Sequence, residues 1–344
     1  MKKSSDNFFI FFNAGRNQKL KKSSTIKKPA MKNLKITLTF GLLFGFLLFS
    51  CEKSNEDPGV VIEGLTVENY PRVDCSTSAG PLQTIIYCEL LGLNYTWTRN
   101  LALDNVFYVY PDIDDYSSFS EKTSVSGTHG AYMSLINKES DLILVAREPS
   151  NYELDAAGME GVELEITPIA LDAFIFITNT NNPVNTLTTS QIKDIYKSNI
   201  TNWKEVGGND SPINPYVRNA NSGSQELMEK LVMKGEPMAD WTEAVLSGMA
   251  GPFSTLRFDE NGLCYTVYYY KEQMVRDQIV KHLSVDGVYP DKKTIGNQSY
   301  PYTTFVYAVV RQDLDRTSIA FKVYEALQTK GGKRIIEKSG YIAN

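Results

Sequence analysis

Arg218-Asn219-Ala220-Asn221-Ser222-Gly223-Ser224-Gln225 places an arginine, then two serines that flank a glycine, directly before a helix-forming run over residues 225–234. The first N–H groups of a helix have no partner within the helix and carry partial positive charge, so they attract anions. Gly223 allows close backbone approach, and Arg218 offers a planar, two-pronged donor set. The stretch therefore predicts an oxyanion-binding turn. The alternative is that Ser222 only caps a helix and Arg218 is a solvated surface charge.

Two further segments show the same order of elements. Residues 70–82 read as a short strand, a hydroxyl-rich turn and a helix with proline in its first turn. Ser126-Gly127-Thr128-His129-Gly130-Ala131 precedes another helical run and then a strand over residues 142–146. Three hydroxyl- and glycine-containing turns, each opening a helix, predict convergence on one small polyoxyanion.

These turns resemble those of the PstS-like phosphate-binding proteins of ABC importers, a branch of the periplasmic substrate-binding superfamily. The resemblance covers most of the chain after residue 65. Besides the three turns, the matching segments are residues 168–177, Asn182-Pro183-Val184, Leu187-Thr188, Gln191-Ile192, Asp194-Ile195-Tyr196, Asn202-Trp203, the glycine pair at Gly207, and the ending around Gly340-Tyr341.

The resemblance implies an α/β fold with two lobes, a ligand cleft between them and two crossings of the chain, near Ala170 and near Tyr300. Lobe 1 is then discontinuous, with residues 65–170 and 301–344, and lobe 2 comprises residues 171–300. The alternation of strand and helix patterns independently favours the α/β class. Strands are expected near Val73 and over residues 142–146, 164–168, 173–178, 215–217 and 304–310, and helices from the capping box at 188–191 and over 318–328 and 332–338.

Carried over residue by residue, the resemblance assigns ligand binding to one residue set. It comprises Thr77 and Ser78 in the first turn, Thr128 in the second, Arg218, Ser222, Gly223 and Ser224 in the third, and also Arg147.

Two positions depart from the family pattern. Cys75 stands where the family usually has glycine. Arg147 stands where the well-studied phosphate binders have an aspartate, which accepts a proton from the ligand and thereby excludes fully ionised sulfate. Glu148 is offset by one residue from that place. Arg147 favours an anion, but the pattern leaves open whether Glu148 replaces the aspartate or faces solvent.

A targeting segment is expected before the fold. Residues 31–35 form a basic region, and residues 36–49 form an apolar run that is short for a permanent membrane span. Leu48-Phe49-Ser50-Cys51 resembles a bacterial lipobox with Cys51 as the lipidated residue. The alternative is a plain signal peptide with an incidental cysteine.

Residues 1–50 are therefore predicted to be an N-terminal extension and signal peptide, with the true start at Met31, and residues 51–64 a tether. This predicts a protein of the bacterial cell envelope, held by a lipid anchor only, on the periplasmic side.

Charge and composition restrict the function further. Residues 1–50 hold ten of the 35 basic side chains and one of the 40 acidic ones, which leaves 25 basic and 39 acidic, a net charge near −14. Such a chain is a poor partner for nucleic acid. The two histidines, His129 and His282, are too few for a multi-histidine metal site, and no nucleophile–base pair or Walker motif is visible. No enzyme activity, metal or cofactor is expected.

The sequence thus predicts a monomeric solute-binding lipoprotein that captures inorganic phosphate for an ABC permease. Two alternatives remain: a binder of another oxyanion, such as sulfate or molybdate, and a sensory or structural lipoprotein that has this fold but no permease. A phosphate-ester hydrolase has the least support.

Overall fold

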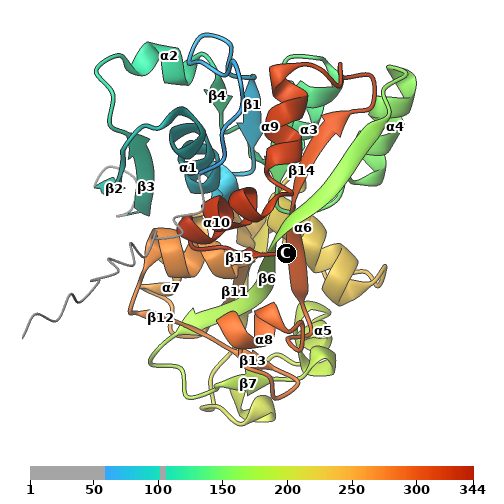
Figure 1. Ribbon diagram of the computed structural model, residues 1–344. Helices are drawn as coiled ribbons and strands as arrows, with labels where there is room; N and C mark the ends of the chain where they lie inside the picture. The colour runs from blue at the N-terminus through green and yellow to red at the C-terminus, as the bar shows by residue number, and fades with distance from the viewer. Residues whose placement is uncertain (1–58, 101–105) are drawn as a thin grey trace, which may run out of the picture. The chain divides into compact units, whose positions relative to one another are not determined.

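The computed structural model describes residues 59–100 and 106–344, which belong to one compact unit (Figure 1). The expected signal peptide, Cys51 and the first part of the tether lie outside the described residues. No helix in the described ranges is long and apolar enough to cross a bilayer.

Among the described residues, nine strands form the main sheet. Seven run in the order β4-β1-β5-β14-β6-β11-β8, and two more, β12 and β15, also pair with β6. Their bounds are β1 Val73–Cys75, β4 Thr123–Ser124, β5 Leu142–Val145, β6 Leu164–Asn179, β8 Asn214–Pro215, β11 Gly262–Val267, β12 Val280–His282, β14 Thr303–Arg311 and β15 Ile342–Ala343. The smaller two-stranded pairs are β2 Tyr95–Asn100 with β3 Val106–Pro111, β7 Thr186–Leu187 with β13 Ser284–Val285, and β9 Val217–Arg218 with β10 Val245–Leu246.

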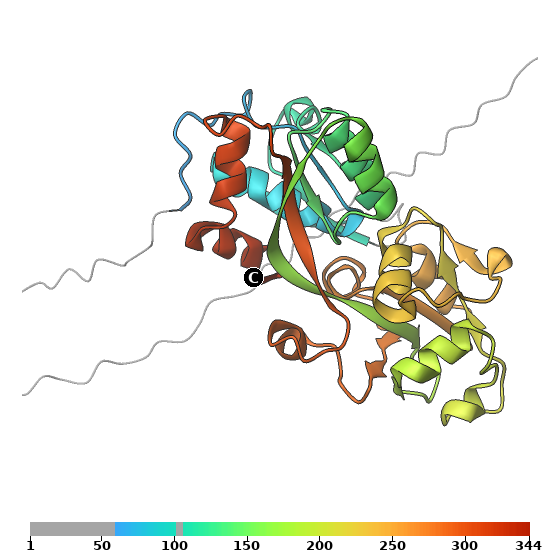
Figure 2. The same ribbon diagram turned by 90° about the vertical axis from the view of Figure 1, so that its right-hand side faces the viewer.

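Strand β6 is the central strand of the fold, because it joins the two lobes. Its first part pairs antiparallel with β14, and its last part pairs with β11 and β12. Figures 1 and 2 show β6 and β14 running side by side through both lobes. The predicted α/β, two-lobed fold with two crossings is confirmed.

The prediction of two separate strands over residues 164–168 and 173–178 was wrong, because β6 is continuous over 16 residues. The register against β14 shifts between Val306 and Tyr307, opposite Ala170 and Pro168. Proline has no N–H to donate to a sheet ladder, and a bulge is where a sheet tolerates it. Pro168 therefore marks an irregularity within one strand and not its end.

Residues 215–217 also differ from the prediction of one strand. Pro215 ends β8, which pairs with β11, whereas Val217 begins β9, which pairs with β10. The chain thus leaves the main sheet just before Arg218.

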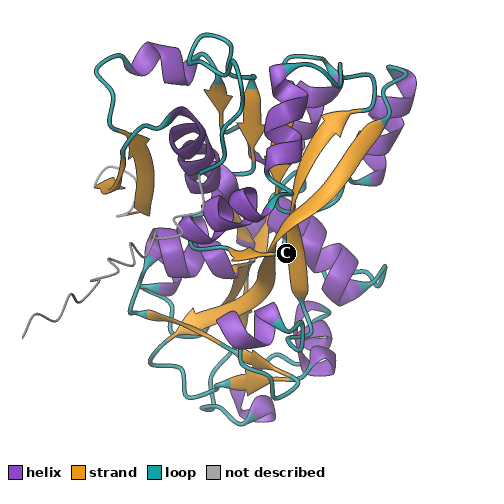
Figure 3. Ribbon diagram, viewed as in Figure 1, coloured by secondary structure: helices purple, strands orange, loops and turns teal. Residues whose placement is uncertain are grey.

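Helices cover the sheet on both sides (Figure 3). Thr188 and Gln191 form the predicted capping box at the start of α5, and the two predicted C-terminal helices are present. The α-helices are α1 Gly80–Leu91, α2 Tyr116–Ser120, α3 Gly127–Ile136, α4 Asn151–Met159, α5 Thr189–Tyr196, α6 Gly223–Leu227, α7 Gly251–Leu256, α8 Lys292–Gly296, α9 Ile319–Ala326 and α10 Lys330–Lys338. A 3-10 turn, η1 Thr77–Ala79, precedes α1, and a π-helix, η3 Met228–Met233, continues α6.

The main hydrophobic cluster holds the lobes' strands together. It runs from Val73 in β1 through Phe174 and Phe176 in β6 to Tyr265 in β11. Cys75, Cys88 and Cys264 are buried and free, and they pack as small apolar residues.

Candidate oxyanion-binding site

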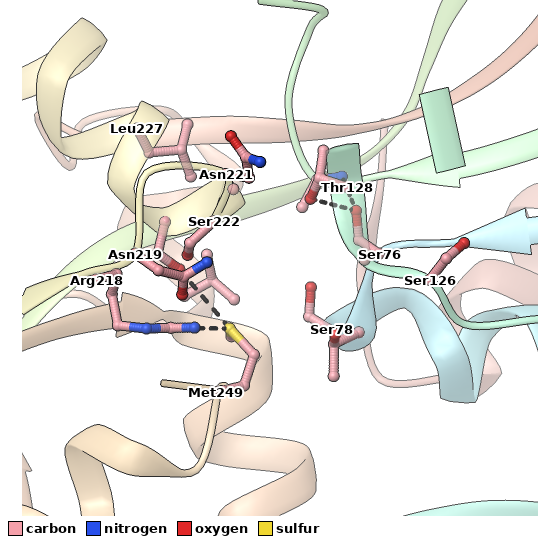
Figure 4. Close-up of a pocket in the computed structure, with 17 residues that line it drawn as sticks. Ser76, Ser78, Ser126, Thr128, Arg218, Asn219, Asn221, Ser222, Leu227 and Met249 are labelled. Carbon is pink, nitrogen blue, oxygen red and sulfur yellow. Dashed lines mark hydrogen bonds between the residues drawn. The ribbon is translucent and has the colours of Figure 1, made fainter. Parts of the chain in front are cut away.

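A cavity of about 230 Å³ lies where the three turns meet (Figure 4). Its walls carry hydroxyl, amide and guanidinium groups. The lining residues are Ser76, Thr77, Ser78, Ser126, Gly127, Thr128, Ala146, Arg218, Asn219, Asn221, Ser222, Gly223, Ser224, Leu227, Gly248, Met249 and Val267. The convergence of three distant segments on one cavity is the central observation about this site.

The first and second turns are joined by hydrogen bonds at the floor of the cavity. Ser76 follows the last residue of β1, and its Oγ lies 2.8 Å from Oγ1 of Thr128 at the start of α3. The N–H of Ala146, just after β5, donates to the same Ser76 Oγ at 3.0 Å. Because β1 and β5 are parallel neighbours, their carboxyl ends bring these groups together.

The second turn is held from behind by a buried carboxylate. Asp74 accepts hydrogen bonds from the backbone N–H of Ser126 at 3.0 Å and from the Ser126 hydroxyl. Gly127 has a φ of +79°, a backbone conformation that suits glycine. Asp74 thus fixes the turn that aims Thr128 at the cavity, while its own oxygens are occupied.

The third turn packs closely against the second, with no room for a side chain at Gly223. Ser222 stands at the N-cap of α6, but its side chain makes no capping hydrogen bond, and it is 8% exposed. A Cβ added to Gly223 would lie 2.5 Å from Oγ1 of Thr128. The capping role considered for Ser222 is therefore absent, and its hydroxyl lines the cavity.

Arg218 is a buried cation in the cavity wall. It is 6% exposed, and its Nε donates to the Leu246 carbonyl at 3.0 Å, while Nη1 lies 3.4 Å from the Met249 sulfur. No carboxylate of the described residues forms an ion pair with it. Burial lowers the pKa of the guanidinium, though arginine keeps its proton in proteins. A buried charge without a counter-ion is costly, so this arrangement favours an anionic ligand.

Arg147 lies outside the lining set, unlike the other predicted residues. Its Nη1 and Nη2 donate to the two carboxylate oxygens of Glu153 at 2.7 and 2.9 Å. Glu153 is fully buried and also accepts from the Ser150 N–H, and His129 Nδ1 lies 3.0 Å from it. Burial alone would raise the pKa of Glu153, but the hydrogen bonds and charge of Arg147 outweigh it and lower that pKa.

Glu148 follows β5 and pairs with a residue of η3, the helix that continues α6. Its carboxylate is 3.4 Å from Nζ of Lys230 in η3, and both side chains are 55% exposed. It is not among the residues that line the cavity.

The sequence predicted seven of the lining residues and missed the others. The seven are Thr77, Ser78, Thr128, Arg218, Ser222, Gly223 and Ser224. Ser76, Asn219 and Asn221 lie within stretches already singled out, so their polar type and position were visible. Gly248, Met249 and Val267 had no local signal, because only the tertiary fold brings them to the cavity. The described residues contain no cluster of three or more histidine, cysteine, aspartate or glutamate side chains that could hold a metal.

The chain belongs to the periplasmic-binding-protein (PBP) superfamily, since the PBP superfamily domain matches residues 113–324. The relatives and solved structures that it matches are named for binding and transport and not for a reaction, in agreement with the expectation that this chain is not an enzyme.

Its relatives include proteins named phosphate-binding protein PstS, which confirms the predicted resemblance. That of Borreliella burgdorferi is 23% identical over 262 residues, covering 74% of this chain and 90% of the relative. That of Staphylococcus epidermidis is 27% identical over 243 residues, covering 67% and 72%.

Two solved structures share the fold. A substrate-binding protein with bound phosphate from Clostridium perfringens has a TM-score of 0.60 and 24% identity, over 79% of this chain and 98% of that one. An ABC-type phosphate transport receptor from Vibrio cholerae has a TM-score of 0.54 and 20% identity, over 78% and 98%.

Proposed function

We propose that this protein captures inorganic phosphate, or a closely related tetrahedral oxyanion, and presents it to an ABC permease. The observation that carries the proposal is Arg218, a buried guanidinium without a carboxylate partner among the described residues, in a cavity lined by hydroxyls. The names of the relatives, phosphate-binding protein PstS, point to the same ligand. The proposed binding residues are Thr77, Ser78, Thr128, Arg218, Ser222, Gly223 and Ser224.

The proposed mechanism is closure of two lobes around the ligand. Lobe 1, residues 65–170 and 301–344, supplies the first two turns, and lobe 2, residues 171–300, supplies the third. An anion that contacts both would favour the closed arrangement through interactions absent from an open one. The near contact of Gly223 with Thr128 and the Glu148–Lys230 pair are contacts that closure would form.

Calorimetric titration of the purified full-length chain with phosphate tests the proposal. We expect saturable binding of one phosphate per chain. Absence of heat with phosphate, sulfate and molybdate alike would contradict it. Turnover of a generic phosphate monoester would instead support the hydrolase alternative.

Substitution of Gly223 by alanine should weaken anion binding, because the added Cβ would clash with Thr128. Its Cβ would lie 2.5 Å from Oγ1 and 3.3 Å from Cβ of Thr128, which is itself held by Ser76. Overpacking of this kind costs about 1–3 kcal/mol, or roughly 5- to 150-fold in affinity if it acts only on closure. Titration with phosphate measures the loss, and the thermal midpoint without ligand should change little.

A double-mutant cycle provides the control for Gly223. Thr128→Ala removes Oγ1, the atom closest to the added Cβ, so Gly223→Ala should cost less in that background than in the wild type. Equal costs in both backgrounds would show that the collision with Thr128 is not the cause.

We also propose that the protein is a lipoprotein anchored through Cys51, on the basis of Leu48-Phe49-Ser50-Cys51, with Met31 as its start. Cys51→Ser should abolish lipidation and leave the chain unprocessed or released from the membrane fraction. Mass spectrometry and membrane fractionation check this outcome. A variant that is processed and fractionates like wild type would refute the anchor, and a mature protein that retains residues 1–30 would refute the start.

Whether the protein works with a permease distinguishes the transport role from the sensory or structural alternative. A transporter role predicts that deletion of this protein lowers phosphate uptake by cells at limiting phosphate. Unchanged uptake, with phosphate binding intact in the purified chain, would favour the sensory alternative.

A further inference from the structure

None of the residues that line the cavity is an aspartate or a glutamate. The acidic residues closest in sequence to the lining residues include Asp74, Glu148 and Glu226, and Glu153 lies near the second turn through its contact with His129. Asp74 accepts from the Ser126 turn and from the Cys75 N–H, and Glu153 is held by Arg147 and Ser150. Glu148 pairs with Lys230 at the surface. Glu226 lines a separate cavity, together with Pro149 and Lys230. Asp74, Glu148 and Glu153 thus have other partners, and none of these four carboxylates lines the ligand cavity.

The polar groups that do line the cavity can adapt to the ligand. A serine or threonine hydroxyl is both a donor and an acceptor, and it rotates to suit its partner, while the Asn219 and Asn221 amides carry both kinds of group. Arg218 donates only. A fully ionised tetrahedral dianion needs donors alone, and this lining supplies them.

Discrimination between phosphate and sulfate requires an acceptor that cannot rotate away. A buried carboxylate is such an acceptor, because its lone pairs stay unpaired and repel a ligand that brings no proton. Hydroxyl groups impose no comparable penalty, since they can donate to either anion. Rejection of the unprotonated ligand therefore has no structural basis in this cavity.

We propose that this site selects its ligand by charge and tetrahedral shape and not by protonation, so that it binds sulfate about as well as phosphate. The inference rests on the proposed oxyanion-binding function and specifies its substrate class. It also answers the open question about Glu148, which is half exposed in an ion pair with Lys230 and does not line the cavity.

Parallel titrations of the purified full-length chain with phosphate and with sulfate test the inference. We expect the two dissociation constants to lie within about tenfold of each other. Phosphate binding with sulfate more than tenfold weaker would overturn the inference and leave the proposed function intact. If neither anion binds, the proposed function fails and the inference fails with it.

A carboxylate placed in the cavity should create the missing selectivity. Ala146 lines the cavity and is 6% exposed, so Ala146→Asp should weaken sulfate binding at least tenfold more than phosphate binding. Ala146→Asn, of the same size without the charge, should lower both affinities alike. A folded Ala146→Asp variant that keeps the wild-type ratio would overturn the inference.

Glu148→Gln is a second test that does not alter the cavity wall. Because Glu148 is half exposed and paired with Lys230, the ratio of phosphate to sulfate affinity should stay at its wild-type value. A lower ratio of phosphate to sulfate affinity in this variant would show that Glu148 accepts the ligand's proton in a hydrogen bond, and would refute the inference.

Discussion

Replacement of Arg218 by alanine should abolish most of the anion affinity while the fold stays intact. The variant loses a buried, charge-assisted contact, worth on the order of 2–4 kcal/mol, or roughly 30- to 1000-fold in affinity. Ser222→Ala should cost less, about 1 kcal/mol, because only a neutral donor is lost. Titration with phosphate measures both, with circular dichroism to check the fold.

Arg276→Ala is the matched control for Arg218. Its guanidinium lies over the rings of Phe107 and Trp97, at 4.3 and 5.3 Å from their centroids, and it does not line the cavity. Anion affinity should be unchanged in this variant. If Arg218→Ala binds phosphate as tightly as Arg276→Ala does, Arg218 has no role in the ligand site.

Replacement of Arg147 by alanine should have the opposite pattern, with a large loss of stability and little loss of anion affinity. Glu153 would be left in a fully buried position without its bidentate partner. Breaking a buried ion pair in this way costs about 3–5 kcal/mol in the free energy of unfolding. Chemical denaturation with and without saturating phosphate measures the two effects separately.

The pH dependence of the stability loss in Arg147→Ala follows from the lowered pKa of Glu153 in the wild type. A carboxyl whose pKa is lower in the folded state contributes its stability above its unfolded pKa, about 4.3, and loses it as the pH falls through the folded pKa. The difference between wild type and Arg147→Ala should therefore be full at pH 7 and shrink in acid. A double variant, Arg147→Met with Glu153→Leu, should recover much of the stability, because it removes both charges. An Arg147→Ala protein that is stable but cannot bind phosphate would assign Arg147 to the ligand.

Many of the helices could be predicted from the sequence, because the features that start a helix lie within a few residues of each other. The capping box of Thr188 and Gln191 and the proline in the first turn of α1 are short-range effects, and both elements formed where expected. The boundary errors came where pairing between distant strands prevailed. Pro168 suggested a strand end, but a bulge against β14 absorbed it and β6 continued.

The candidate site divides in the same way. The sequence by itself determined the three hydroxyl-rich turns, because each is a contiguous pattern before a helix start, and it singled out Arg218 by its place in one of them. Only the tertiary structure decided that Arg218 is buried beside Met249 without a carboxylate partner among the described residues, and that Arg147 pairs with Glu153 instead. The physical reason is that a side chain's partners depend on which segments pack against it. Residues 147 and 153 come together through the start of α4, whereas 218 and 249 come together through the pairing of β9 with β10.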